Sequence, residues 1–216
     1  MNKRTVEMIR LIDVLNYEHE LTEDEFSIVK LYSKSIRWGV RWAVAENLGI
    51  VDFTEENRKL LLKLLRDRRK EVASQACESL GERGDTDCLD ALKRKAESGS
   101  YMVRGYAANA VAKICKRNSC DVDENAKWLE MRLKSEKSGW TRSSLHCALF
   151  TIGKKEHLEG LVDCLKDEDF NVRIAAASMI EKCAMSDTGL RDELKRLAEE
   201  KFDKTSREYA FLTGEA

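Results

Sequence analysis

Apolar and small residues recur along this chain with the spacing of one helix face. Five segments carry the pattern: VRWAVAENLG from Val40, VASQACESLG from Val72, VRGYAANAVA from Val103, TRSSLHCALF from Thr141 and VRIAAASMIE from Val172. Their apolar or small residues fall at the first, fourth or fifth, and eighth or ninth positions, on one side of an α-helix. The segments begin 32, 31, 38 and 31 residues apart. This period predicts stacked repeats, with an insertion in the fourth unit.

Second amphipathic stretches lie between these segments, and each opens with a residue suited to cap a helix. Thr22 and Glu25 form a capping-box pattern, and Thr54 precedes the leucine-rich run that ends at Leu65. The remaining predicted caps are Asp85, Asp121, and Asp187 or Thr188. The repeating unit is therefore predicted to be two antiparallel helices.

The residues just ahead of each ten-residue segment support the same division. Five residues before each start stand Ser35, Asp67, Ser98, Glu136 and Asp167, most of which accept hydrogen bonds from free amides at a helix N-terminus. Alanines inside the segments predict close helix packing, because a larger side chain would hold neighbouring helices apart. These alanines are Ala43, Ala76, Ala107, Ala108, Ala175 and Ala176.

The pattern Asp-x-x-x-x-Val-Arg-x-x-Ala-x-x-x-Leu, clearest from Asp167 to Ile180, resembles the second helix of HEAT repeats (the HEAT-like or PBS-lyase type). The resemblance implies an all-α, right-handed α-α superhelix of about six antiparallel helix pairs. We expect one domain over residues 1–216: a capping helix within 1–20, five repeats over 21–184 and a degenerate pair over 185–216. Two units depart from the pattern, with Ala73 in place of Arg and Thr141 in place of Val.

The composition favours a helical protein with reduced cysteines, and it does not identify a binding partner. Proline is absent and charged residues make up 36% of the chain, which favours solvated helices over sheet. A formal charge of −1 gives no overall attraction to nucleic acid or to an anionic membrane. Seven cysteines without paired spacing indicate reduced thiols, and no stretch has the length of a signal core or a membrane span. We therefore expect a cytoplasmic protein.

No catalytic or metal-binding signature emerges from the sequence, and we expect neither a metal nor another cofactor. The runs from Asp121 to Asn125 and from Asp167 to Asn171 begin like calcium loops but lack the glycine and glutamate that follow in an EF-hand. His146 and Cys147 are neighbours, and their side chains diverge by about 100° on a helix. An enzymatic role stays open.

Two features predict a binding surface. Aromatic and arginine residues recur near the start of the second helices, and in HEAT arrays these helices line the concave face. The candidates are Arg37, Trp38, Arg41, Trp42, Tyr101, Arg104, Trp140, Arg142 and Phe170. The second feature is a basic patch formed by Arg58, Lys59, Lys63, Arg66, Arg68, Arg69 and Lys70. The aromatic residues could instead fill gaps between repeats, the arginines could pair with acids of the adjoining repeat, and the basic run could be a solvated helix face.

Three functions are compatible with this sequence. The first is a non-catalytic scaffold or adaptor that binds a protein or peptide, with no membrane contact. The second is a nucleic-acid-binding protein that resembles HEAT-like alkylbase DNA glycosylases, with Glu46 as a candidate acid, although a coherent basic stripe is missing. The third is a regulatory subunit or a toxin-immunity protein. The first is the leading hypothesis.

Overall fold

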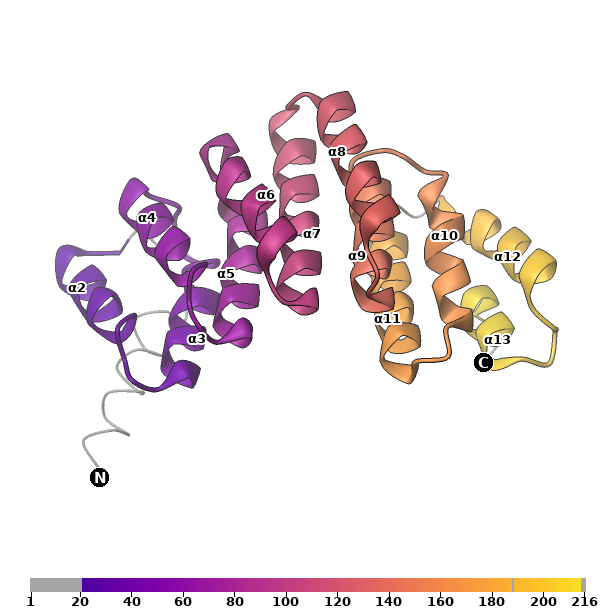
Figure 1. Ribbon diagram of the computed structural model, residues 1–216, viewed down its shortest axis with the longest axis horizontal. Helices are drawn as coiled ribbons and strands as arrows, with labels where there is room; N and C mark the ends of the chain where they lie inside the picture. The colour runs from indigo at the N-terminus through magenta and orange to yellow at the C-terminus, as the bar shows by residue number, and fades with distance from the viewer. Residues whose placement is uncertain (1–20, 188, 215–216) are drawn as a thin grey trace. The chain divides into compact units, whose positions relative to one another are not determined.

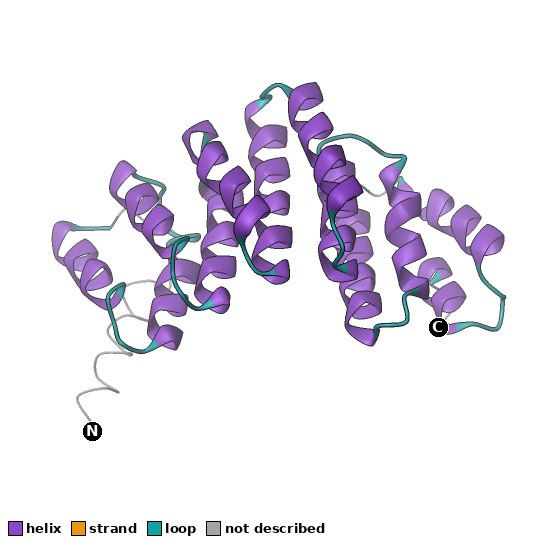
Figure 2. Cartoon of the chain, in the orientation of Figure 1, coloured by secondary structure: helices purple, strands orange, loops and turns teal. Residues whose placement is uncertain are grey.

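The computed structural model describes residues 21–187 and 189–214, and this part of the chain is all-α. Twelve α-helices and two short 3-10 turns follow one another within the described residues (Figures 1 and 2). The helices form six consecutive pairs, which confirms the predicted fold class of a HEAT-like solenoid. The predicted helix within residues 1–20 lies outside the described residues.

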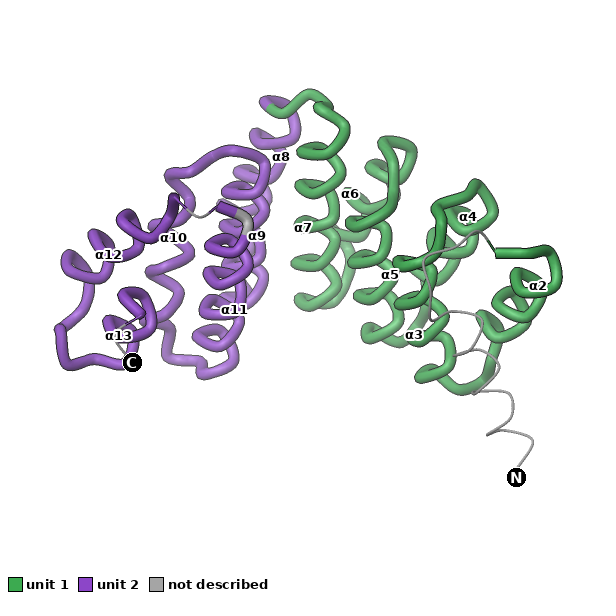
Figure 3. Tube along the Cα trace, turned by 180° about the vertical axis from the view of Figure 1, so that it is seen from behind, with its two compact units in different colours: residues 1–122 green, residues 123–216 purple. Residues whose placement is uncertain are grey.

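The chain divides into two compact units, residues 1–122 and residues 123–216 (Figure 3). Each unit has its own packed helices, so the two are described separately. The sequence-based boundaries, with one domain over 1–216, five repeats over 21–184 and a terminal pair over 185–216, stay a prediction.

Unit 1 contains three helix pairs, each made of a first helix and a second helix. The first helices are α2 (Glu23–Tyr32), α4 (Glu55–Leu64) and α6 (Leu89–Ser98), and the 3-10 turn η1 (Thr86–Cys88) precedes α6. The second helices are α3 (Trp38–Asn47), α5 (Lys70–Arg83) and α7 (Tyr101–Asn118). Helix α5 packs between α3 and α7, so the three second helices lie side by side.

Unit 2 holds the remaining three pairs. These are α8 (Val122–Ser135) with α9 (Gly139–Thr151), α10 (His157–Asp163) with α11 (Phe170–Ser186), and α12 (Leu190–Lys201) with α13 (Arg207–Thr213). The 3-10 turn η2 (Cys164–Lys166) extends α10. Helices α9 and α11 pack against each other, and Tyr209 and Leu212 of α13 are buried in the same apolar core as Leu161 and Ile180.

Each second helix begins two residues before its ten-residue segment, and the predicted acceptors explain where it begins. Asp67 and Asp167 accept the backbone amides of Arg69 and Asp169 at 2.9 Å. These carboxylates fix the turn just before the helix, and Arg69 and Asp169 are the residues that precede the first helical turn. The predicted capping box of Thr22 with Glu25 is confirmed.

The small residues of the pattern allow the second helices of unit 1 to approach closely. Ala76, Ala107 and Ala108 are fully buried, as predicted. A Cβ placed on Gly81 of α5 would lie 3.0 Å from the Cα atom of Ala110 on α7. The interface between α5 and α7 therefore requires residues with little or no side chain.

Candidate partner-binding surface

Arg41, a predicted partner-binding residue, is held by an ion pair across two helix pairs. Its Nε and Nη2 atoms donate to the two carboxylate oxygens of Asp67 at 2.6 and 2.9 Å, and Nη1 donates to the carbonyl of Ser35 at 2.6 Å. Hydrogen bonding to Asp67 raises the pKa of Arg41, and the same bond lowers the pKa of Asp67. Arg41 thus joins the turn before α3 to the turn before α5, as expected for an arginine that pairs with the adjoining repeat.

Other members of the arginine column close their own turns. Arg104 donates to the carbonyl of Gly99 at 3.0 Å, and Arg173 donates to the carbonyl of Asp167 at 2.7 Å. Both carbonyls belong to the turn ahead of the second helix, as Ser35 does for Arg41. Arg37 and Arg142 are exposed instead. The same geometry at Arg41, Arg104 and Arg173 indicates a structural role for these three positions.

The predicted aromatic residues differ in exposure. Trp38, Tyr101 and Phe170 are exposed, with 42%, 44% and 62% of their surface accessible to solvent. Trp42 is half-buried, and Trp140 packs against the apolar core of unit 2. The aromatic residues at the very start of a second helix are therefore accessible, whereas those further along are partly covered.

In unit 1 the accessible aromatic residues and part of the basic patch form one surface. The guanidinium of Arg69 lies 5.2 Å from the ring centre of Trp38, and the Lys70 ammonium lies 5.8 Å from that of Tyr101. Since α5 packs between α3 and α7, its two basic residues connect the two aromatic residues. We call Trp38, Arg69, Lys70 and Tyr101 the α3–α5–α7 edge.

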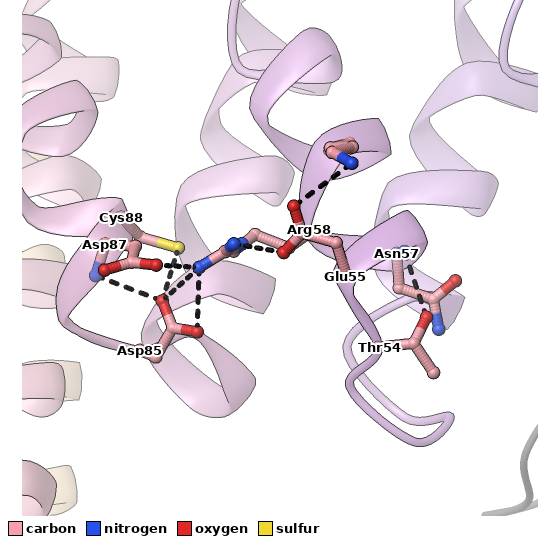
Figure 4. A network of polar contacts seen from close by, with 8 residues as sticks. Thr54, Glu55, Asn57, Arg58, Asp85, Asp87 and Cys88 are labelled. Carbon is pink, nitrogen blue, oxygen red and sulfur yellow. Dashed lines mark hydrogen bonds and ion pairs between the residues drawn. The ribbon is translucent and has the colours of Figure 1, made fainter.

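The beginning of the predicted basic patch is neutralised by acids. Arg58 of α4 bonds Glu55 and Asp87, and its Nη1 lies 3.1 Å from the Asp85 carboxylate, so it links α4 to the turn before α6 (Figure 4). Lys59 pairs with Glu55 at 3.2 Å. These two cations act within the fold, and Arg69 lies 3.5 Å from the Glu71 carboxylate. Lys63, Arg66, Arg68 and Lys70 are left as the uncompensated part of the patch among the described residues.

The end of the patch occupies an unfavourable place for positive charge. Helix α4 ends at Leu64 and only Lys63 stands in its last turn, where the helix dipole favours a cation. Arg69 precedes the first turn of α5, and Lys70 opens that turn. A helix N-terminus disfavours positive charge, so the dipole does not explain why basic residues stand there. Residues that oppose local stability are expected at functional surfaces.

Glu46, the acid candidate of the glycosylase-like hypothesis, is half-buried on α3. Partial burial raises the pKa of Glu46, and the negative charge of Glu78 on α5 raises it further. The same Glu78 charge acts on Tyr106 of α7, whose pKa is raised mainly by burial. Negative charge on both Glu46 and Glu78 opposes the approach of nucleic-acid phosphates to this face.

The residues considered for metal or nucleophilic chemistry have structural partners. Asp167 and Asp169 accept backbone amides, at 2.9 and 2.8 Å, which fits helix capping and not a calcium loop. Within residues 21–187 and 189–214, no group of three or more histidine, cysteine or acidic side chains is arranged to hold a metal ion. His146 lies beside His157, with 3.2 Å between their Nδ1 atoms.

A comparison with known protein families agrees with this arrangement of repeated helix pairs. A family model described as HEAT repeats matches residues 57–149. This segment of the chain is similar to HEAT repeats. The matched range runs from most of α4 to most of α9. A search of curated proteins found no match. Among the described residues, no helix has both the length and the apolarity to cross a membrane.

Sequence reasoning missed a second set of arginines, at the opposite ends of the second helices. Arg83 of α5 donates to the carbonyls of Gly49 and Ile50 at 3.1 and 2.7 Å. Arg117 of α7 donates to the carbonyl of Gly81 at 2.9 Å and also bonds that of Gly84. Each arginine satisfies carbonyls at the end of the preceding second helix. The sequence signal for this set is the spacing of Arg83 and Arg117, which stand 34 positions apart and outside the ten-residue pattern.

Proposed function

We propose that the protein is a non-catalytic, cytoplasmic scaffold or adaptor that binds a protein segment on the α3–α5–α7 edge. HEAT repeats commonly serve as protein-interaction scaffolds, so the repeat match over residues 57–149 supports this class of function. The observation that carries the proposal is the pairing of exposed Trp38 and Tyr101 with Arg69 and Lys70. Aromatic and arginine side chains are the residues that most often dominate the affinity of protein interfaces.

The charges of the edge favour an acidic partner with apolar side chains. Arg69 and Lys70 carry positive charge, and neighbouring Arg37 is exposed as well. Ile36, in the turn before α3, is 97% exposed and extends the apolar part of the surface next to Trp38. A segment that places apolar side chains against Trp38 and Ile36, with carboxylates near the cations, matches both features.

The test compares binding after loss of each aromatic side chain. A protein captured from native lysate by the tagged full chain is identified by mass spectrometry and purified. Its affinity is then measured by calorimetry for the wild type, Trp38→Ala, Tyr101→Ala and the control Met131→Ala. Met131 is 61% exposed on α8 of unit 2, so this variant removes an accessible apolar side chain outside the edge.

We expect Trp38→Ala and Tyr101→Ala each to weaken binding by about 2 kcal/mol, roughly 30-fold, while helicity and melting temperature stay unchanged. Met131→Ala should bind like the wild type. Equal affinity of all variants would refute the edge as the binding surface. Recovery of nucleic acid alone, lost at high salt, would favour the glycosylase-like hypothesis instead.

A further inference from the structure

An open depression of about 570 Å³ lies in unit 1 beside the α3–α5–α7 edge, at the ends of α2 and α4. Its lining comes from the turn after α2, from α3, from the end of α4 and from the turn before α5. The lining residues are Ser33, Arg41, Lys59, Leu62, Lys63, Leu64, Arg66, Asp67 and Arg68. We call this the cation-lined depression.

Positive charge dominates the cation-lined depression. Of the nine described residues that line it, five are basic and Asp67 is the one acid. Asp67 is already bound by both ends of the Arg41 guanidinium, and Lys59 is paired with Glu55 at 3.2 Å. Lys63, Arg66 and Arg68 form no ion pair within the described residues. Three uncompensated cations therefore surround one depression.

The fold gives no reason for this concentration of charge. Lys63 benefits from the C-terminal end of α4, but Arg66 and Arg68 lie beyond it in the turn before α5. Like charges around one depression repel each other. An anion bound among the three cations would turn this repulsion into attraction.

We propose that the cation-lined depression binds a phosphoryl group, and that the group is a phosphorylated side chain of the protein partner. A phosphate ester carries close to two negative charges and three acceptor oxygens, and the paired N–H groups of Arg66 and Arg68 match such acceptors. This identification of the ligand rests on the proposed function. Arg68 adjoins Arg69, which stacks on Trp38, so one bound segment reaches both the edge and the depression.

The arrangement of charge favours a single anionic group over a nucleic acid strand. A strand requires cations spaced along a groove, whereas Lys63, Arg66 and Arg68 converge on one depression. Arg58, on α4 and facing the turn before α6, is neutralised by Glu55, Asp85 and Asp87. A row of backbone phosphates would meet these carboxylates beyond the depression.

The test uses the full chain and defined probes, and needs no captured partner. Inorganic phosphate, a capped alanine peptide with a central phosphoserine, the same peptide with serine, and a single-stranded oligouridine are titrated at constant ionic strength. Binding is followed by ¹H–¹⁵N chemical shifts of the backbone amides. The variant Arg66→Gln/Arg68→Gln is compared with Arg94→Gln/Lys116→Gln, which removes two exposed unit 1 cations outside the depression.

We expect the phosphoserine peptide to shift amides in the turns before α3 and α5 and to bind more tightly than inorganic phosphate. Arg66→Gln/Arg68→Gln should weaken its binding at least about tenfold, and the control pair by less than about twofold. Equal losses in the two variants would show diffuse charge and overturn the site. Tighter binding of inorganic phosphate or of oligouridine would overturn the phosphorylated partner.

The outcome is separable from that of the proposed function. Trp38→Ala leaves Lys63, Arg66 and Arg68 in place, so phosphoserine binding should persist in that variant. Phosphoserine binding without any effect of Trp38→Ala on partner affinity would refute the edge and keep the depression. Partner binding that depends on Trp38 but not on phosphate would support the edge and refute the phosphoryl site in the depression.

Discussion

Acid should destabilise unit 2 through its pair of neighbouring histidines. His146 of α9 and His157 of α10 lie with their Nδ1 atoms 3.2 Å apart and their ring centres 5.3 Å apart. One ring must donate and the other accept, so the contact needs at least one neutral ring. The His146 ring also packs on Gly160, where an added Cβ would stand 2.2 Å from its Cε1 atom. The ring is therefore confined on the side that faces Gly160.

Burial lowers the pKa of His146 from 6.5 to about 4, and the charges of His157 and Arg142 lower it further in the same direction. Between these two values the unfolded chain binds a proton that the folded chain does not, so stability falls as the pH falls below 6.5. With these two pKa values, the titration of His146 removes about 2 kcal/mol of the unfolding free energy at about pH 5. Because His146 is only half-buried, solvent screening reduces the expected loss to about 1 kcal/mol.

Urea unfolding followed by circular dichroism, at about pH 7.5 and about pH 5, measures this loss. The comparison is between the wild type and His146→Gln, which keeps a polar side chain but cannot titrate. Carboxylates contribute equally to both proteins, so the difference between them isolates the histidine. We expect the wild type to lose about 1 kcal/mol more than the variant on acidification. The same pH dependence in both proteins would refute the argument.

Three further predictions concern unit 1. Asp67→Asn should lower the free energy of unfolding by about 2 kcal/mol because it leaves Arg41 without its carboxylate. In urea unfolding, the double variant with Arg41→Met should lose less free energy than the sum of the two single variants. Cys77 is buried and its pKa is raised to about 12, so it should react with a disulfide reagent at about pH 8 only after urea unfolding. Fast reaction of Cys77 in the native protein would contradict its burial. Gly81→Leu should lower the free energy of unfolding by about 2–3 kcal/mol because a Cβ there already meets the α7 backbone. Gly39→Ala should not destabilise the protein because the space around Gly39 is open. Equal melting temperatures of the two variants would refute the close approach of α5 and α7.

The repeat architecture was predictable because its pattern is local and recurs. A hydrophobic period inside each segment identifies a helix face, and the recurrence of the segment identifies the stacking unit. The small residues at Ala76, Ala107 and Ala108 then predict close packing, which their complete burial confirms. Each of these inferences depends on residues a few positions apart.

Helix boundaries were less accessible to sequence reasoning. One interpretation of the basic run from Arg58 to Lys70 is a solvated helix face. Helix α4 instead ends at Leu64, and the last basic residues stand at the start of α5. The sequence has no proline or glycine between the two helices, so Asp67, five residues before the second segment, is the local signal for this turn. The turn is fixed by Asp67, whose carboxylate accepts the amide of Arg69 and binds Arg41 of the preceding pair.

The exposure of the aromatic residues could not be settled from the sequence because it depends on neighbouring pairs. Trp38 and Trp42 lie one helical turn apart on α3, so the hydrophobic pattern does not separate them. Trp38 is exposed because it opens the helix, beyond the region that α5 covers, whereas Trp42 is partly covered. The contact between Trp38 and Arg69 joins residues 31 positions apart, and no short-range pattern predicts it.

The two sets of arginines explain why the proposed binding residues lie at one end of the second helices in unit 1. At the far end, Arg83 and Arg117 satisfy the carbonyls of the preceding helix, so those cations are used by the fold. At the near end one arginine, Arg41, closes the turn with Asp67, and that single pair satisfies the local backbone. Further cations there, such as Arg68 and Lys70, face solvent at a helix N-terminus that disfavours them. A partner that supplies negative charge at this end would remove that cost, which is why binding is proposed there and not at the far end.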